Sequence, residues 1–332
     1  MKDLIAAVDI GATKITVSIC NRDGFLIRLY QRTRLQGDER TIPDQVREMI
    51  VYSMERIDAD GKPSAVGIST AGPFGSRNDM IELVSPNICG GMAPERGILP
   101  NDWKSVPLEK VLREDFDDPV IQNDAVSGVV AERTFGAGIG FDNLVYVTWS
   151  TGIGTGAYVD GRLIRGKNGN APHGGHVYLG DDGPKCGCGN RFDMEAVASG
   201  TAISAAYGGE KSAKDVFRLY TEGDKKAKNV VKEAARYFAR GLASVNSVLD
   251  TKLFIIGGSV YLNNEKLLLP MVEEEFYRAF PALTEDVIFR RSGLGEYLGD
   301  IAAVSLVIPG DWMDRWKDKK PWEDAPETIH IE

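Results

Sequence analysis

The chain has 332 residues, of which 43% are hydrophobic and 26% charged; this composition is typical of globular proteins, and the length suffices for two domains because single cores stop growing at about 250–300 residues. Its formal net charge of -9 argues against a protein whose main task is to grip the phosphate backbone of a nucleic acid. No run approaches the roughly 18 apolar residues of a membrane helix, and the amino terminus carries no signal-peptide pattern. We therefore expect a cytoplasmic protein with no nucleic-acid or membrane partner.

The first half of the chain predicts a three-stranded hairpin unit, then a helix and a buried strand. The strands are expected over residues 4–10, 15–20, 25–30 and 65–69, and the helix over residues 43–57. Asp23-Gly24 is a strong hairpin signal between the second and third strands. Thr41 is placed to cap the helix, Pro43 lies in its first turn, and Gly72-Pro73 ends the last strand.

The second half repeats this order. Strands are predicted over 144–149, 156–159 and 162–164, then a helix over Lys225–Leu249, a strand over 253–256 and a helix from about Glu265. Each half thus begins with a hairpin unit that contains a Gly/Thr turn and continues with alternating helices and strands. Such a coarse internal duplication favours two α/β lobes that face each other across a cleft.

The last stretch, residues 309–332, is highly charged and holds Trp312, Trp316 and Trp322. We interpret it as a tail folded back over the body. The alternative is a segment that binds a partner.

Two turns have the composition of phosphate-binding sites. Residues 9–14 read Asp-Ile-Gly-Ala-Thr-Lys and combine a strand-end carboxylate with backbone amides, a hydroxyl and an ammonium. Glycine allows close approach and the amides donate to phosphate oxygens, while Asp9 is suited to hold Mg²⁺ through water. Residues 151–156 supply a second Gly/Thr turn at the matching place of the second half. Each turn alone is also compatible with an ordinary hairpin, but the paired placement favours triphosphate binding.

Asp124 follows a short strand predicted over residues 120–122 and opens a helix. A carboxylate at such a switch from strand to helix is well placed to face a ligand cleft. There it can orient an attacking hydroxyl and accept its proton, which together with a metal and phosphate-binding groups suffices for phosphoryl transfer. The alternative is that Asn123 or Asp124 only caps the helix.

A cluster of metal-binding residue types follows in the second half. His173 and His176, two of only three histidines, precede Cys186, Cys188, Asp193 and Glu195. Imidazole, thiolate and carboxylate are all zinc ligands, and closed tetrahedral sites are usually structural. We therefore predict Zn²⁺ bound by His176, Cys186, Cys188 and Asp193; the alternative is a glycine-rich loop with exposed thiols.

Taken together, these motifs resemble those of the ROK family (repressor, open reading frame, kinase) of the actin-like ATPase and sugar kinase superfamily, over about residues 4–307. The resemblance implies an α/β, two-lobed, actin-like (ribonuclease H-like duplicated) sugar kinase fold with ATP and sugar in the interlobe cleft. We expect a small lobe of residues 1–119, joined by a C-terminal helix at about 297–332, and a larger lobe of residues 120–296. The resemblance to the family also implies a homodimer.

The resemblance further implies roles for individual residues. Asp124 matches the catalytic base and Asn123 a ligand of the sugar hydroxyls, whereas His176 and Glu195 match residues that bind the sugar near C1–C2. The nucleotide and its phosphates would be bound by Asp9, Gly11, Thr13, Lys14, Thr151, Gly152, Gly154, Gly257 and Gly258.

The chain departs from the family pattern at two positions. Asp193 stands where the fourth zinc ligand is usually a cysteine, so either Asp193 completes a harder site or water does. His173 stands where sugar kinases of the family have a glutamate. Because histidine can donate, accept or carry charge, we hypothesise that His173 alters recognition at C1–C2, toward an N-acetylated or otherwise substituted hexose.

The predicted function is therefore an ATP-dependent sugar kinase that transfers phosphate to the 6-hydroxyl of a hexose or N-acetylhexosamine. Glucokinase or hexokinase activity is one possibility, and N-acetylmannosamine or N-acetylglucosamine kinase activity is the other. A different class, a sugar-sensing ROK regulator, carries an added amino-terminal DNA-binding domain in the family. The acidic composition and the early first strand favour the enzyme.

Overall fold

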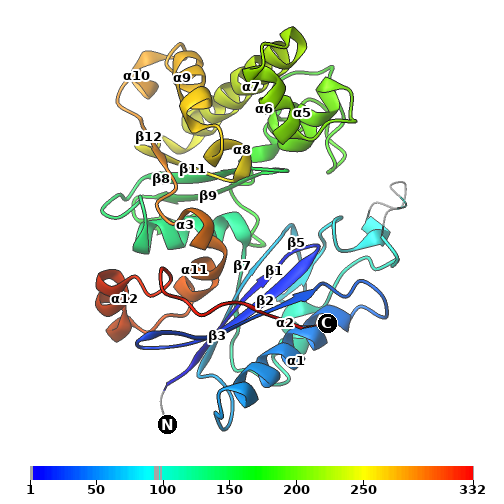
Figure 1. Ribbon diagram of the computed structural model, residues 1–332, viewed down its shortest axis with the longest axis vertical. Coiled ribbons are helices and arrows are strands. Elements are labelled where there is room, and N and C mark those ends of the chain that lie inside the picture. Colours follow the sequence, from blue (N-terminus) through cyan, green and yellow to red (C-terminus); the bar gives the residue numbers. More distant parts are fainter. Residues whose placement is uncertain (1–2, 93–96, 98, 332) are drawn as a thin grey trace. The chain divides into compact units, whose positions relative to one another are not determined.

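The computed structural model describes residues 3–92, 97 and 99–331. The chain packs into two compact units, and Figure 1 labels helices and strands of both. Unit 1 comprises Met1–Phe135, Arg165–Asn170 and Glu296–Glu332, and unit 2 comprises Gly136–Ile164 and Ala171–Gly295. Unit 1 therefore also contains a strand and a helix, β7 and α3, that lie beyond residue 119.

Unit 1 is built on a six-stranded sheet. Its strands, in the order β13-β3-β2-β1-β4-β7, are Ile329–His330, Gly24–Arg32, Lys14–Asn21, Ile5–Ile10, Ala65–Thr70 and Val120–Asn123. β1 is antiparallel to β2 and parallel to β4, and β4 is parallel to β7. A small hairpin of β5 (Phe74–Arg77) and β6 (Met80–Leu83) lies outside this sheet.

Helices cover both faces of the unit 1 sheet. The helices of this unit are α1 (Thr41–Arg56), α2 (Leu108–Leu112), α3 (Asp124–Phe135), α11 (Leu298–Ser305) and α12 (Met313–Lys319). Alternate residues of β1, including Ala6 and Val8, are fully buried in one core with apolar residues of α1. On the other face α11 packs against β1, β4 and α3. There Gly67 permits close contact, because a Cβ at this position would overlap the backbone of Ala303.

The C-terminal tail folds back on unit 1. Trp312, Trp316 and Trp322 are buried, and Trp322 packs against Phe135 of α3 with ring centroids 5.5 Å apart. The chain then ends in β13, which pairs in parallel with the outer strand β3. This arrangement agrees with the interpretation of residues 309–332 as a tail folded over the body.

Unit 2 repeats the strand order of unit 1. Its sheet has the order β10-β9-β8-β11-β12, with the strands Arg162–Leu163, Ile153–Val159, Leu144–Trp149, Leu253–Gly257 and Ile288–Arg291. β8 is antiparallel to β9 and parallel to β11. In unit 1, β1 is likewise antiparallel to β2 and parallel to β4. The duplicated α/β fold inferred from the pattern of elements is therefore confirmed.

One face of the unit 2 sheet carries a large helical core (Figure 1). Its helices are α4 (Met194–Ala198), α5 (Gly200–Tyr207), α6 (Ala213–Thr221), α7 (Lys225–Leu249), α8 (Ser259–Leu262), α9 (Glu265–Phe276) and α10 (Pro281–Thr284). Trp149 of β8 stacks on Phe238 of α7 with ring centroids 3.8 Å apart. No helix in the described residues is long and apolar enough to cross a membrane.

Two local predictions are wrong. Thr41 does not cap α1: it is the first helical residue, after Arg40, and its hydroxyl donates instead to the carbonyl of Gln36. The strand predicted from residue 156 begins at Ile153, because β9 pairs with β8 directly from the turn. Gly154 therefore lies inside a strand, opposite Thr148.

Candidate active site and metal-binding group

In unit 1 the carboxyl ends of three parallel strands are level with one another. Asp9 of β1 lies opposite Ser69 of β4, and Ser69 lies opposite Gln122 of β7. Asp124 follows two residues later as the first residue of α3. Since ligands of open α/β sheets bind outside the carboxyl ends of the strands, this edge is a candidate active site. It brings Asp9 and Asp124 together from distant parts of the chain.

The carboxylates of Asp9 and Asp124 interact electrostatically. Burial and, next to it, the neighbouring carboxylate of Asp124 raise the pKa of Asp9 to about 7, although the ammonium of Lys14 opposes the shift. Burial also raises the pKa of Asp300, which α11 brings to the same edge and which forms an ion pair with Arg28. A buried carboxylate with a raised pKa is a frequent mark of a functional site. The pattern of residues had not pointed to Asp300, because it lies in sequence far from every motif.

Asn123 and Asp124 both contact the start of α3. The amide nitrogen of Ala125 donates to Asn123 Oδ1 at 3.0 Å and to Asp124 Oδ1 at 2.7 Å, so these residues do cap the helix. Asn123 is buried, whereas the side chain of Asp124 is exposed. Gly72 makes room for the Asn123 amide, because a Cβ at residue 72 would lie 2.9 Å from its Nδ2. Capping therefore fixes Asp124 while leaving its carboxylate accessible.

The turn from Gly11 to Lys14 joins β1 to β2 at the same edge. The amide of Gly11 donates to the carbonyl of Lys14 at 2.8 Å, which closes a tight turn. Thr33 Oγ1 donates to the carbonyl of Gly11 at 2.8 Å and so anchors this turn to the end of β3. The side chains of Thr13 and Lys14 are exposed, as expected for groups that would meet phosphate.

In unit 2 a corresponding turn joins β8 to β9. Its backbone is held by the start of α5, where the amide of Gly200 donates to the carbonyl of Ser150 at 2.7 Å. Thr201 Oγ1 donates to the carbonyl of Thr151 at 3.0 Å. Thr151 and Gly152 lie in this turn, while Gly154 lies in β9.

Gly257 and Gly258 end β11, the parallel neighbour of β8. Gly257 lies opposite Thr148, which brings this segment beside the turn at Thr151. Gly258 has a φ of 84° and a Cβ there would collide with the backbone of Trp149. Only glycine therefore fits this position, and α8 begins directly after it.

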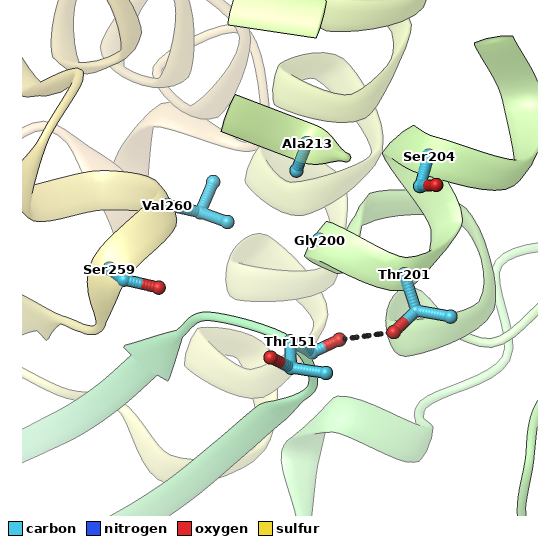
Figure 2. A pocket seen from close by; sticks show the side chains of 7 residues that line it. All are labelled: Thr151, Gly200, Thr201, Ser204, Ala213, Ser259 and Val260. Carbon is cyan, nitrogen blue, oxygen red and sulfur yellow. Dashed lines mark hydrogen bonds between the residues drawn. The ribbon is translucent and has the colours of Figure 1, made fainter. Parts of the chain in front are cut away.

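A pocket of about 290 Å³ opens between these two segments of unit 2 (Figure 2). Its lining residues are Thr151, Gly200, Thr201, Ser204, Ala213, Ser259 and Val260. The volume is near the lower end of small-molecule sites. Only Thr151 was predicted from the sequence, because the contributions of α5, α6 and α8 follow from packing and carry no motif.

The predicted metal ligands also lie together, all in unit 2. His176, Cys186, Cys188 and Asp193 each offer one ligand atom, and these atoms lie within 4.8 Å of one another. The thiols come from a tight loop in which the amide of Gly189 donates to the carbonyl of Cys186 at 3.1 Å. Asp193 is fully buried and divides its carboxylate: Oδ1 accepts from the Ala196 amide at 2.8 Å and caps α4, while Oδ2 lies 3.0 Å from His176 Nδ1.

The distances within this metal-binding group fit a tetrahedral ion. Cys186 Sγ and Cys188 Sγ lie 3.7 and 3.5 Å from His176 Nδ1, and Cys188 Sγ lies 3.5 Å from Asp193 Oδ2. Around tetrahedral zinc, with bonds of about 2.3 Å to sulfur and about 2.0 Å to nitrogen or oxygen, such ligand atoms would be about 3.5 Å apart. His176 Nδ1 and Asp193 Oδ2 are closer, at 3.0 Å, and all four ligand atoms lie within 4.8 Å of one another, so a bound ion would require modest adjustments of these side chains.

The surroundings raise the pKa of three of these four side chains. Burial lowers the pKa of His176, but the hydrogen bond to Asp193 and the charge of Glu195 outweigh it and raise the pKa overall. Burial raises the pKa of the Cys186 and Cys188 thiols. A bound cation would replace the protons of these groups, since thiolate and neutral imidazole are the ligating forms.

His173 and Glu195 border the metal-binding group. His173 adopts a left-handed backbone conformation with φ of 47°, and its ring centroid lies 5.1 Å from that of His176. Gly175 docks this loop on β9, because a Cβ there would overlap the carbonyl of Ile153. Glu195 Oε2 accepts from the amide of Ile153 at 2.8 Å. Glu195 thus reaches the turn that contains Thr151 and Gly152.

The chain is similar to known proteins over most of its length. The ROK family model matches residues 5–308. A glucokinase of Aeropyrum pernix is 34% identical over 309 residues, which cover 85% of this chain and 91% of the relative. An N-acetylmannosamine kinase of Escherichia fergusonii is 32% identical over 267 residues, covering 79% and 85%. The crystal structure of a ROK hexokinase from Thermus thermophilus is 31% identical and has a TM-score of 0.75, covering 91% of this chain and 97% of that one.

Proposed function

Since this chain belongs to the ROK family, we propose that it is an ATP-dependent sugar kinase that phosphorylates the 6-hydroxyl of a hexose or N-acetylhexosamine. The observation that carries this proposal is the placement of Asp124 at the carboxyl end of β7, level with Asp9 and its glycine turn. Relatives that are glucokinases and N-acetylmannosamine kinases support the same reaction class. The duplicated, actin-like sugar kinase fold is shared with the hexokinase from Thermus thermophilus.

Asp124 is the proposed catalytic base. Its exposed carboxylate, fixed at the start of α3, would accept the proton of the sugar 6-hydroxyl as the hydroxyl oxygen bonds to the γ-phosphorus of ATP. The bond from that phosphorus to the bridging oxygen breaks, and ADP leaves with the electron pair. Asn123 would hold a neighbouring sugar hydroxyl. Phosphoryl transfer needs mainly positioning and charge stabilisation, which one carboxylate and two phosphate-binding turns supply.

Two glycine-containing turns are proposed to bind the phosphates of the nucleotide. Asp9, Gly11, Thr13 and Lys14 of unit 1 and Thr151, Gly152 and Gly154 of unit 2 are the proposed phosphate-binding residues. Gly257 and Gly258 lie beside the pocket at Thr151 and would receive the adenosine. Mg²⁺ neutralises phosphate charge in such reactions, and Asp9 would hold it through water.

The metal-binding group is proposed to hold a structural Zn²⁺ through His176, Cys186, Cys188 and Asp193. A closed set of one imidazole, two thiolates and one carboxylate leaves no open position for catalysis. His176 would ligate through Nδ1, which faces Asp193, so that Nε2 on the other side of the ring can contact the sugar. Glu195 and His173, which border the group, complete the proposed sugar site near C1–C2.

A coupled assay of ADP release over a panel of hexoses and N-acetylhexosamines tests the kinase. We expect Mg²⁺-dependent turnover that falls by orders of magnitude, about 10²–10⁴-fold, in Asp124→Asn, since the amide cannot accept the proton. Asp117→Asn, an exposed neighbour, is the matched control and should keep the wild-type rate. A full rate in Asp124→Asn would refute the assignment of the base.

The sugar preference is proposed to depend on His173. The specificity constant, kcat/KM, of wild type and His173→Glu should be compared on glucose, N-acetylmannosamine and N-acetylglucosamine. We expect the glutamate variant to shift toward glucose, because a carboxylate accepts hydrogen bonds from two sugar hydroxyls. An unchanged ranking of the three sugars would show that position 173 does not set specificity.

Two broader properties are also proposed. A homodimer is expected from the family and is testable by light scattering. A cytoplasmic location is expected because ATP and reduced thiolates coexist there. The rival function, a sugar-sensing regulator, would bind sugar without turnover in the same assay.

A further inference from the structure

Glu195 connects the metal-binding group with the turn at Thr151 and Gly152. Its Oε2 accepts from the Ile153 amide at 2.8 Å, and its Oε1 lies 3.4 Å from Cys186 Sγ. One carboxylate therefore reaches from a metal ligand to the turn that the proposed function assigns to ATP phosphates. The sugar role expected for Glu195 does not account for this contact.

The turn is shaped around this carboxylate. A Cβ at Gly152 would lie 2.7 Å from Glu195 Oε2, so the glycine leaves the space that the carboxylate occupies. The hydrogen bond points the amide of Ile153 toward Glu195 Oε2. Among the described residues, the amides of Thr151 and Gly152 donate to no protein acceptor. Those two amides are therefore the ones available to a phosphate.

Glu195 is itself held by the metal-binding group. It lies in the first turn of α4, a helix of five residues, and helices this short are not stable on their own. The N-cap of α4 is Asp193, whose other carboxylate oxygen faces His176. The metal-binding group therefore fixes the position of Glu195 through the first turn of α4, and Glu195 fixes the amide of Ile153 through its hydrogen bond.

We propose that Glu195 is a positioning residue for the phosphate-binding turn, and that the metal-binding group supports nucleotide affinity through it. This inference rests on the proposed kinase function. It predicts that loss of the metal, or of the Glu195 carboxylate, weakens nucleotide binding even in the absence of sugar. A group that served only the sugar site would leave nucleotide binding unchanged.

The test is calorimetric titration of sugar-free protein with Mg²⁺–ADP. We expect the Kd to rise about tenfold in Glu195→Ala and in wild type stripped with a chelator, about 1.4 kcal/mol in each case. Stripping should add little in Glu195→Ala, because the connection is already broken. Glu195→Gln retains an oxygen acceptor for the Ile153 amide and should stay within threefold of wild type.

Two controls separate this inference from general instability and from the kinase proposal. Asp224→Ala removes the cap of α7 and should lower the melting temperature without changing the Kd. Hydrogen exchange at the Ile153 amide should accelerate in Glu195→Ala but not in Asp224→Ala. If wild type binds ADP and Glu195→Ala binds it equally well, the positioning role is wrong while the kinase stands. If wild type binds no ADP, the proposed function itself is wrong.

Discussion

Asp193 performs two tasks that substitution can separate. Its Oδ1 caps α4 and its Oδ2 lies in the metal-binding group. Asp193→Ala removes both the cap and the ligand. Asp193→Asn retains an oxygen for the cap but replaces the anionic ligand with a neutral amide. Asp193→Cys restores the thiolate that the family pattern has at this position and removes the cap.

The expected changes follow from these contacts. Loss of an N-cap costs about 1 kcal/mol, and a domain of this size loses about 2–4 °C in Tm for each kcal/mol. After treatment with a chelator, the alanine and cysteine variants should therefore melt about 2–4 °C below wild type, and the asparagine variant close to it. Added zinc should then stabilise the cysteine variant most, wild type less, and the other two least, because stabilisation by a ligand grows with its affinity.

Differential scanning calorimetry with and without zinc, combined with elemental analysis, measures both tasks. About one zinc per chain is expected for wild type and for Asp193→Cys. If Asp193→Asn binds zinc as tightly as wild type, Asp193 is not a ligand and water completes the site. If chelated Asp193→Asn melts as low as Asp193→Ala, the capping argument is wrong.

Three further predictions concern other parts of the chain. Because the pKa of Asp9 is raised to about 7, the native state holds this proton to higher pH than the unfolded chain. Asp9 should therefore lower the unfolding free energy by about 3 kcal/mol as the pH rises from 4 to 7, and urea titrations should show this loss in wild type but not in Asp9→Asn. Gly258→Ala should weaken Mg²⁺–ADP binding at least tenfold and lower Tm, because its Cβ would displace the backbone of Trp149; unchanged calorimetric binding would remove this segment from the nucleotide site. Trp322→Ala should destabilise unit 1 by about 3–5 kcal/mol, since Trp322 is buried against Phe135; a chemical denaturation midpoint equal to that of wild type would mean that the tail packs only loosely.

Elements with strong local signals were predictable from the sequence. The helix predicted over Lys225–Leu249 agrees with α7 at both ends, and in the structure Asp224 caps its start. The hairpin strands of both halves were also found. By contrast, β13 has two residues and exists only because the edge of β3 is available to it. The error at Thr41 has a local cause, since its hydroxyl donates to the carbonyl of Gln36 in the preceding loop.

The candidate site was predictable where residue type alone specifies chemistry. The four proposed metal ligands do converge. They could be predicted because His, Cys and Asp are the residue types that bind zinc, and here they lie close together in the sequence. The contacts that support the site were not predictable. The hydrogen bond from Ile153 to Glu195 depends on how α4 packs against β9, and the lining of the pocket by Ser204 and Ala213 depends on the helical core.

The discontinuity of unit 1 has a consequence for synthesis on the ribosome. Its strand β13 and helices α11 and α12 are translated last, whereas β1 to β4 are translated first. Unit 2 lies between these two groups in sequence and can complete its own core while residues after Gly295 are still inside the ribosome. Domains generally fold as units during synthesis, so the second unit is expected to be native before the first. Until β13 has emerged, the outer edge of β3 stays unpaired and is the surface for which a chaperone would be most needed.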